Sequence, residues 1–173
     1  MAAPELLPAE AKSEHTISLF VNNKPGVLVR VALVFSRRGY NIESLVVSPA
    51  ASGDFSRMTI TCSGDPQTLQ QIIRQLQKLV DVVRAIDHSD DQSYETELAL
   101  VKVACALDQR TEILQIAEHF NAKVVDYGPQ SLMLRIYGSS EKLDAFMGLV
   151  RPYGLRELVR SGKILMARGL QET

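Results

Sequence analysis

The chain has 173 residues, and 19 Lys and Arg against 20 Asp and Glu leave it with a net charge of −1. At roughly 150 residues per domain, this length fits one domain or two small ones. The charge balance argues against a protein that binds nucleic acid through a basic face, because phosphate contacts supply most of that affinity. Apolar runs fall short of the ~20 residues that a membrane span requires. Two cysteines are too few for a disulfide framework.

Residues 1–14 form an acidic segment that contains two prolines and three glutamates. They lack the basic start and the apolar core of a signal peptide, and they are too acidic for a transit peptide. We therefore expect a disordered tail and a cytoplasmic protein.

From His15 onward the hydrophobic pattern changes period several times. Residues 15–21 alternate apolar and polar side chains, which is typical of a half-buried strand. Residues 25–38 carry apolar side chains at i, i+3, i+4 and i+7, the stripe of an amphipathic helix, and Gly39 stands where helices commonly end. Two strands, a second helix and a fourth strand are then expected at 40–48, 55–62, 65–80 and 82–87.

The same succession of elements returns in the second half of the chain. Strands are expected at 98–105, 122–128 and 131–138, and helices at 109–120 and 140–151. The last stretch is strand-like but is interrupted at Ser161 and Gly162. The order strand-helix-strand-strand-helix-strand therefore occurs twice.

This repeated order predicts an α+β protein with two tandem ferredoxin-like (βαββαβ) units, each a four-stranded antiparallel sheet with both helices on one face. The expected boundaries are a disordered tail over 1–14, a first domain over 15–88, a linker over 89–97 and a second domain over 98–173. A sheet with an uncovered face and unpaired edges is usually completed by another copy. We therefore expect at least a homodimer.

The stretch LFVNNKPGVL, residues 19–28, carries the most chemical information. Pro25 is expected at the first helical position, with Asn22 or Asn23 as the cap. Gly26 has no Cβ, so another group can approach the backbone, and the N–H groups of residues 26–28 would face outward from a helix N-terminus, which attracts a carboxylate or phosphate. A purely structural turn is the alternative, since a phosphate loop normally carries more glycines or a Lys-Ser/Thr pair.

Three motifs, RRGYNIESL, SRMTI and QLQKLVDV, occur in this order in the first half. Together with NNKPGVL they make this half resemble the ACT domain of the regulatory small subunits of acetolactate synthase. The similarity continues through ELALVKV, KLDAFMGLVRPYG and RSGKILMARG, so it covers nearly all of the chain from His15 to Gly169.

The resemblance implies a protein with no catalytic residues and no cofactor of its own. Small subunits of this family bind a large catalytic subunit, where thiamine diphosphate, Mg and FAD are expected, and raise its activity. They also confer feedback inhibition by a branched-chain amino acid, typically valine. The alternative is a free-standing ACT-domain sensor of amino acids that regulates a different partner.

The resemblance further implies an effector site between the ACT domains of two chains. The strand-helix loop of one chain and the second strand of the other would supply it: Asn23, Gly26, Val27 and Leu28, with Asn41 and Ile42. The amides at 26–28 would bind the effector carboxylate, and the two Asn side chains its polar edges. Val27, Leu28 and Ile42 would pack against its aliphatic side chain. Val27 stands where family members often have a smaller residue, which could change which effector fits.

The remaining candidates for chemistry are isolated residues. His15, His88 and His119 have no carboxylate or thiol at ligand spacing, so we expect them at surface or boundary positions and expect no metal site. Cys62 and Cys105 each end an apolar strand and are expected in the core.

Overall fold

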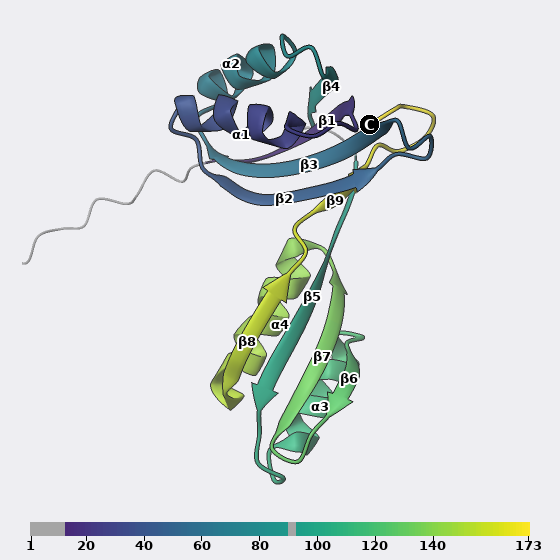
Figure 1. The fold of residues 1–173 in the computed structure, drawn as a ribbon. Coiled ribbons are helices and arrows are strands. Elements are labelled where there is room, and N and C mark those ends of the chain that lie inside the picture. Colours follow the sequence, from purple (N-terminus) through teal and green to yellow (C-terminus); the bar gives the residue numbers. More distant parts are fainter. Residues whose placement is uncertain (1–12, 90–92) are drawn as a thin grey trace, which may run out of the picture. The chain divides into compact units, whose positions relative to one another are not determined.

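The structure, a computed structural model, describes residues 13–89 and 93–173, so the expected tail up to residue 12 lies outside the described residues. The chain forms two compact units (Figure 1). The first contains β1 (Ser13–Asn22), α1 (Val27–Arg37), β2 (Ile42–Pro49), β3 (Phe55–Gly64), α2 (Pro66–Leu76) and β4 (Val82–Asp87). The second contains β5 (Tyr94–Ala104), α3 (Arg110–His119), β6 (Lys123–Tyr127), β7 (Ser131–Gly138), α4 (Ser140–Val150), β8 (Leu155–Arg160) and β9 (Ile164–Met166).

The first unit is a four-stranded sheet in the order β2-β3-β1-β4. The central strand β1 is antiparallel to both neighbours, with Ile17 opposite Ile60 on β3 and Leu19 opposite Ala85 on β4. Helices α1 and α2 cover the same face of this sheet (Figure 1). This arrangement confirms the predicted ferredoxin-like topology.

The core of the first unit lies between the sheet and its two helices. Alternate residues of β1 and β3 are buried toward the helices because side chains on a strand alternate between its faces. The buried apolar residues of these strands and helices include Ile17, Leu19, Ile60, Cys62, Val31, Phe35, Leu69 and Ile72. Burial, followed by the nearby carboxylates of Glu43, Asp87 and Glu14, raises the pKa of the Cys62 thiol to about 12. Cys62 is therefore a core residue, as expected, and is not a reactive thiolate at neutral pH.

The second unit repeats this topology with strand order β6-β7-β5-β8. Its central strand β5 is antiparallel to β7 and β8, and the core between this sheet and helices α3 and α4 contains Val101, Leu134, Ile113 and Phe146. Cys105 is also buried in it. The two predicted ferredoxin-like units are thus both present.

Two expected boundaries need correction. Strand β1 begins at Ser13, inside the stretch assigned to the tail, because Ser13 pairs with Gly64. Strand β5 begins at Tyr94, inside the segment 89–97 assigned to a linker. Its first residues pair with the short additional strand β9, with Tyr94 opposite Met166. Because of this pairing, polar residues whose composition is typical of a linker form part of a strand.

Two histidines are more buried than the sequence suggests. His15 and His88 are both buried, so the expected surface or boundary positions are wrong for these two. The His88 Nε2 atom lies 2.7 Å from Ser18 Oγ, and His15 Nδ1 lies 3.0 Å from Ser89 Oγ. These contacts connect β1 to the end of β4 and satisfy polar groups that would be costly to bury unpaired.

Gly154 offers a test of how tightly the second unit is built. It has a φ of +98°, and a Cβ added there would lie 2.9 Å from the main-chain oxygen of Ala104. Because Ala104 N–H donates to Gly154 O at 2.9 Å, the end of β5 and the residue just before β8 cannot easily move apart. Gly154→Ala is expected to lower the free energy of unfolding by about 1–2 kcal/mol from the left-handed backbone alone, plus the cost of the overlap. The measurement is urea unfolding followed by circular dichroism.

Gly148 supplies the matched control, since it lies within α4 and a Cβ there would meet nothing within 4 Å. Gly148→Ala should raise the free energy of unfolding by up to ~1 kcal/mol. Equal effects of the two substitutions would contradict this account of Gly154.

Candidate functional site

The loop before α1 presents a glycine at the start of the helix. Gly26 is the N-cap residue with φ +82° and ψ −7°, a left-handed conformation that favours glycine, and no side chain caps the helix. Helix α1 begins at Val27, so the predictions of Pro25 at the first helical position and of an Asn cap are wrong. The left-handed turn at Gly26 is what separates Pro25 from the helix. The end of the helix is as expected, since Gly39 follows it with φ +67°.

Asn23 is held in place by the neighbouring turn between β2 and β3. Its Nδ2 donates to Gly53 O at 3.0 Å, and its main-chain N–H donates to Asp54 O at 2.9 Å. One of the two N–H groups of this side chain is thus used within the chain, and its oxygen can accept a hydrogen bond. The Asn23 oxygen is therefore a possible acceptor for an ammonium group.

Val27 and Leu28 point in different directions. The side chain of Val27 is 2% exposed and belongs to the core, whereas Leu28 is 42% exposed. The expectation that Val27 packs against a ligand side chain is therefore wrong, because its side chain faces the sheet. Its main-chain N–H donates to Lys24 O at 3.4 Å, a long bond. Leu28 is the apolar side chain that this loop offers to a ligand or to another molecule.

An ion pair that the sequence analysis missed lies beside Gly26. Arg30 Nη2 donates to Asp81 Oδ2 at 2.5 Å. A Cβ built on Gly26 would lie 3.5 Å from Arg30 Nη1, so the guanidinium stands next to the helix start. The spacing of four residues between Gly26 and Arg30, one helical turn, is the signal that could have indicated this proximity.

The other half of the predicted site lies at the opposite end of α1. Asn41 is exposed and Ile42, the first residue of β2, is half-buried. Both line a hollow of about 450 Å³ whose remaining walls come from Ala32, Phe35, Ser36, Gly39 and Tyr40. The Tyr40 hydroxyl donates to Asp65 O at 2.5 Å. Burial and then the charge of Asp65 raise the pKa of Tyr40, so this wall carries no charge at neutral pH.

One chain does not bring the six predicted residues together. Helix α1 has 11 residues, and at 1.5 Å per residue it separates the loop at 23–28 from residues 41–42 by about 16 Å. A free amino acid is much shorter than this distance. The six residues can form one site only if a second copy supplies one of the two halves.

The composition and spacing of the described residues decide whether they could hold a metal ion or form a membrane-spanning helix. Among the residues that the structure describes, no group of three or more His, Cys, Asp or Glu side chains could hold a metal ion. No described helix is long and apolar enough to cross a membrane. What the loop offers is a helix N-terminus, a fixed ion pair and amide oxygens, which together suit recognition of a small charged molecule.

Both halves of the chain match known protein families. A family described as "AHAS small subunit-like ACT domain" matches residues 17–84, and one described as "Small subunit of acetolactate synthase" matches residues 96–169. The probable acetolactate synthase small subunit of Archaeoglobus fulgidus is 43% identical over 90% of this chain and 98% of its own length. The acetolactate synthase small subunit of Mycolicibacterium smegmatis is 44% identical over 90% of this chain and 91% of its own length.

A solved structure shows the same fold. The crystal structure of the acetolactate synthase small subunit from Thermotoga maritima has a TM-score of 0.82 and 36% sequence identity. It covers 91% of this chain and 98% of its own length. The similarity therefore includes both units and not the first alone.

Proposed function

Because the chain belongs to the acetolactate synthase small-subunit family, we propose that it raises the activity of a thiamine-diphosphate-dependent catalytic subunit and makes that enzyme sensitive to feedback inhibition by a branched-chain amino acid. We take valine as the effector, in the biosynthesis of valine, leucine and isoleucine. Thiamine diphosphate, Mg and FAD belong to the catalytic partner in this proposal.

The main support for this proposal is that α1 separates the two halves of the predicted site, the loop at 23–28 and residues 41–42. A twofold axis that sets two α1 helices side by side and antiparallel brings the start of one helix next to the end of the other. The Gly26 loop of one copy then faces the Asn41 hollow of the second copy. The exposed side chains of Leu28 and Leu33 on α1 and the edge strand β2 support a homodimer at this place.

The chemical groups around this proposed interface between two copies suit a zwitterion. The outward N–H groups at the start of α1 and the guanidinium of Arg30 attract the effector carboxylate. The Asp81 carboxylate and the Asn23 side-chain oxygen attract its ammonium group. Leu28 of one copy and Ile42 of the other would enclose its aliphatic side chain, and burying that group contributes ~1.5–3 kcal/mol.

Discrimination among branched-chain amino acids rests on the shape of this apolar wall. One methylene group changes binding by only ~1–3 kcal/mol in an apolar pocket. Because Val27 lies in the core, it does not narrow the pocket, and Leu28 and Ile42 set its width.

A ligand held between two copies favours one arrangement of the pair over others. It inhibits only if it binds the inhibited arrangement more tightly, and such couplings are typically ~1–3 kcal/mol. In the alternative role, a free-standing ACT-domain sensor of amino acids would use the same interface between two copies. Only the protein that it regulates would differ.

Reconstitution distinguishes the two roles. The chain, mixed with the large subunit of acetolactate synthase from the same organism, should co-purify with it and raise its specific activity several-fold, and valine should then reduce that activity. Unchanged synthase activity with and without the chain, despite a folded chain, would favour the free-standing sensor.

Gly26→Asp tests the position of the effector carboxylate. The new side chain places a negative charge beside the helix start, where the effector carboxylate would lie, so valine binding should weaken at least ~100-fold. Isothermal titration with valine, leucine and isoleucine measures this loss, and the inhibition assay on the reconstituted enzyme measures its consequence.

Gly169→Asp is the matched control for this substitution. Gly169 also has a positive φ, +72°, and a Cβ there would meet nothing within 4 Å. This variant carries the same strain and charge in the second unit and should bind valine normally. Inhibition that persists in Gly26→Asp, or is lost equally in both variants, would contradict the placement.

A further inference from the structure

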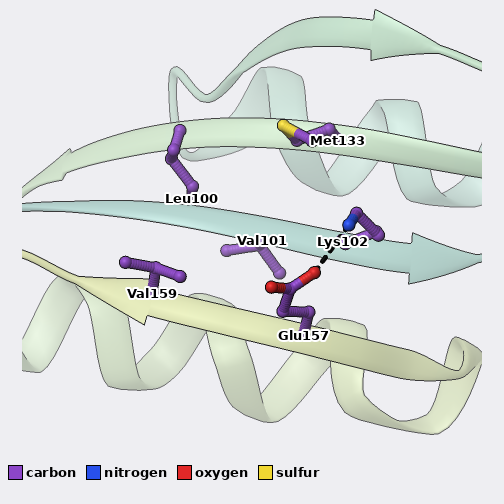
Figure 2. A pocket seen from close by; sticks show the side chains of 6 residues that line it. All are labelled: Leu100, Val101, Lys102, Met133, Glu157 and Val159. Atoms are coloured by element: carbon purple, nitrogen blue, oxygen red, sulfur yellow. Dashed lines mark hydrogen bonds and ion pairs between the residues drawn. The ribbon is translucent and has the colours of Figure 1, made fainter.

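Two hollows differ in what they could hold. The hollow at the end of α1, which is lined by Tyr40, Asn41 and Ile42, measures about 450 Å³. A shallow hollow on the sheet of the second unit, between Leu100 and Val159, measures about 120 Å³ (Figure 2). Small-molecule sites usually measure ~300–1,000 Å³. The second hollow falls below this range, whereas the hollow beside Tyr40 can take an amino acid.

Tyr40 is anchored through both its main chain and its side chain. Its main-chain N–H donates to Phe35 O at 3.1 Å, which attaches it to the end of α1. Its hydroxyl donates to Asp65 O at 2.5 Å, at the junction between β3 and α2. The side chain thus connects the turn after α1 to the start of the next helix.

Asp65 is itself held firmly in place. It is the N-cap residue of α2, and its side chain accepts from Thr68 N–H at 2.8 Å. Its main-chain oxygen also accepts from Leu69 N–H at 3.1 Å. A carbonyl oxygen can accept two hydrogen bonds, so this oxygen serves the helix and Tyr40 together. It therefore gives the Tyr40 hydroxyl a fixed attachment point.

The ring of Tyr40 occupies the space where Gly64 would carry a side chain. A Cβ built on Gly64 would lie 2.1 Å from Tyr40 Cζ and 2.2 Å from the Tyr40 hydroxyl oxygen. Gly64 cannot easily retreat, because it pairs with Ser13 on β1 and its carbonyl oxygen lies 3.2 Å from His15 Nε2. A side chain at position 64 would therefore displace the ring and not the strand.

The turn anchored by Tyr40 carries the second half of the candidate effector site. Asn41 follows Tyr40 directly, and consecutive Cα atoms are only ~3.8 Å apart. Asn41 lies between α1 and β2 and is exposed, and Ile42 is the first residue of β2. The positions of both residues therefore depend on where Tyr40 holds the turn.

We propose that Tyr40 is a positioning residue of the effector site. Its ring lies against Gly64 and its hydroxyl binds Asp65, and these two contacts hold the turn at the end of α1. The turn then presents Asn41 and Ile42 to an amino acid. This inference rests on the proposed function, in which that amino acid lies between two copies of the chain.

A double-mutant cycle on the full chain, read by isothermal titration with valine, tests this role. Gly64 has no positive φ, so Gly64→Ala adds a methyl group without backbone strain and should displace the ring. Valine binding should then weaken ~10-fold. Tyr40→Leu lacks the ring atoms nearest to Gly64 and should weaken binding by a similar factor. The double variant should bind valine no more weakly than Tyr40→Leu alone, because the added methyl group meets no ring.

Gly148→Ala is the matched control for the cycle. It adds the same methyl group within α4, where nothing lies within 4 Å, and it should bind valine like the unmodified chain. Losses that multiply to ~100-fold in the double variant would overturn the proposal. Valine binding by Gly64→Ala that equals that of the unmodified chain would also overturn it.

Circular dichroism on the same samples reports whether each variant is folded. If Gly64→Ala is unfolded, the double variant should recover the fold of Tyr40→Leu, since the overlap with the ring is gone. A double variant that stays unfolded while Tyr40→Leu is folded would overturn the proposal.

A tyrosinate titration separates this inference from the proposed function, because it needs no valine. Burial, followed by the charges of Asp65 and Cys62, raises the pKa of Tyr40. The absorbance step that is lost in Tyr40→Leu belongs to Tyr40, and in Gly64→Ala it should move to lower pH, because the displaced ring is less buried. An unmoved step would overturn the proposal. A moved step in a protein whose unmodified form binds no valine would contradict the proposed function, on which the role of Tyr40 in the site rests.

Discussion

Helix α1 fixes the distance on which the functional account of this chain depends. It holds the glycine-opened loop and residues 41–42 about 16 Å apart, because 11 helical residues rise 1.5 Å each. A helix is stiff, so no small side-chain movement can bring the two half-sites of one copy onto one amino acid. The effector site we propose therefore exists only in a pair of chains, and its occupancy is coupled to how the pair is arranged. That coupling is what an inhibitor of a multi-subunit enzyme needs.

The two units have the same topology but treat the corresponding loop differently. In the first unit, the loop before the first helix contains Gly26 and leaves the helix start open to other molecules. In the second unit, Arg110 begins the helix, is buried, and donates from Nη2 to Gly128 O and Pro129 O at 2.6 Å each. Its guanidinium also lies over the Tyr127 ring at 4.6 Å. The start of α3 is thus occupied by a side chain of its own unit, whereas no side chain caps the start of α1.

Much of the fold could be predicted because local signals and the fold agree. Asp65 caps α2 by accepting from Thr68 N–H, and Pro66 follows it, as the sequence indicates. Gly39 ends α1 in the expected left-handed conformation. The start of β5 could not be predicted, because its polar residues become a strand only through pairing with β9, about 70 residues later. Local periodicity carries no information about such a partner.

The loop that we propose as half of the effector site was predictable as a loop, but its contacts were not. The motif located the strand-helix loop, yet the family resemblance assigned Val27 to the ligand although its spacing from Val31 and Phe35 (i, i+4, i+8) already places it on the buried face of the helix. The Arg30–Asp81 pair joins residues 51 positions apart, so only the folded chain reveals it. The buried positions of His15 and His88 likewise depend on distant partners.

Subunit mixing tests the shared site most directly. Gly26→Asp and Asn41→Ala each damage both sites of their own homodimer, but a mixed dimer keeps one site with an intact loop and an intact Asn41. After unfolding and refolding an equal mixture, half of the dimers are mixed, so about a quarter of all sites should bind valine with the original affinity. Isothermal titration that detects this fraction, where neither variant alone binds with that affinity, agrees with a site built from two chains. A mixture that binds no better than its two components, although mixed dimers have formed, would contradict it.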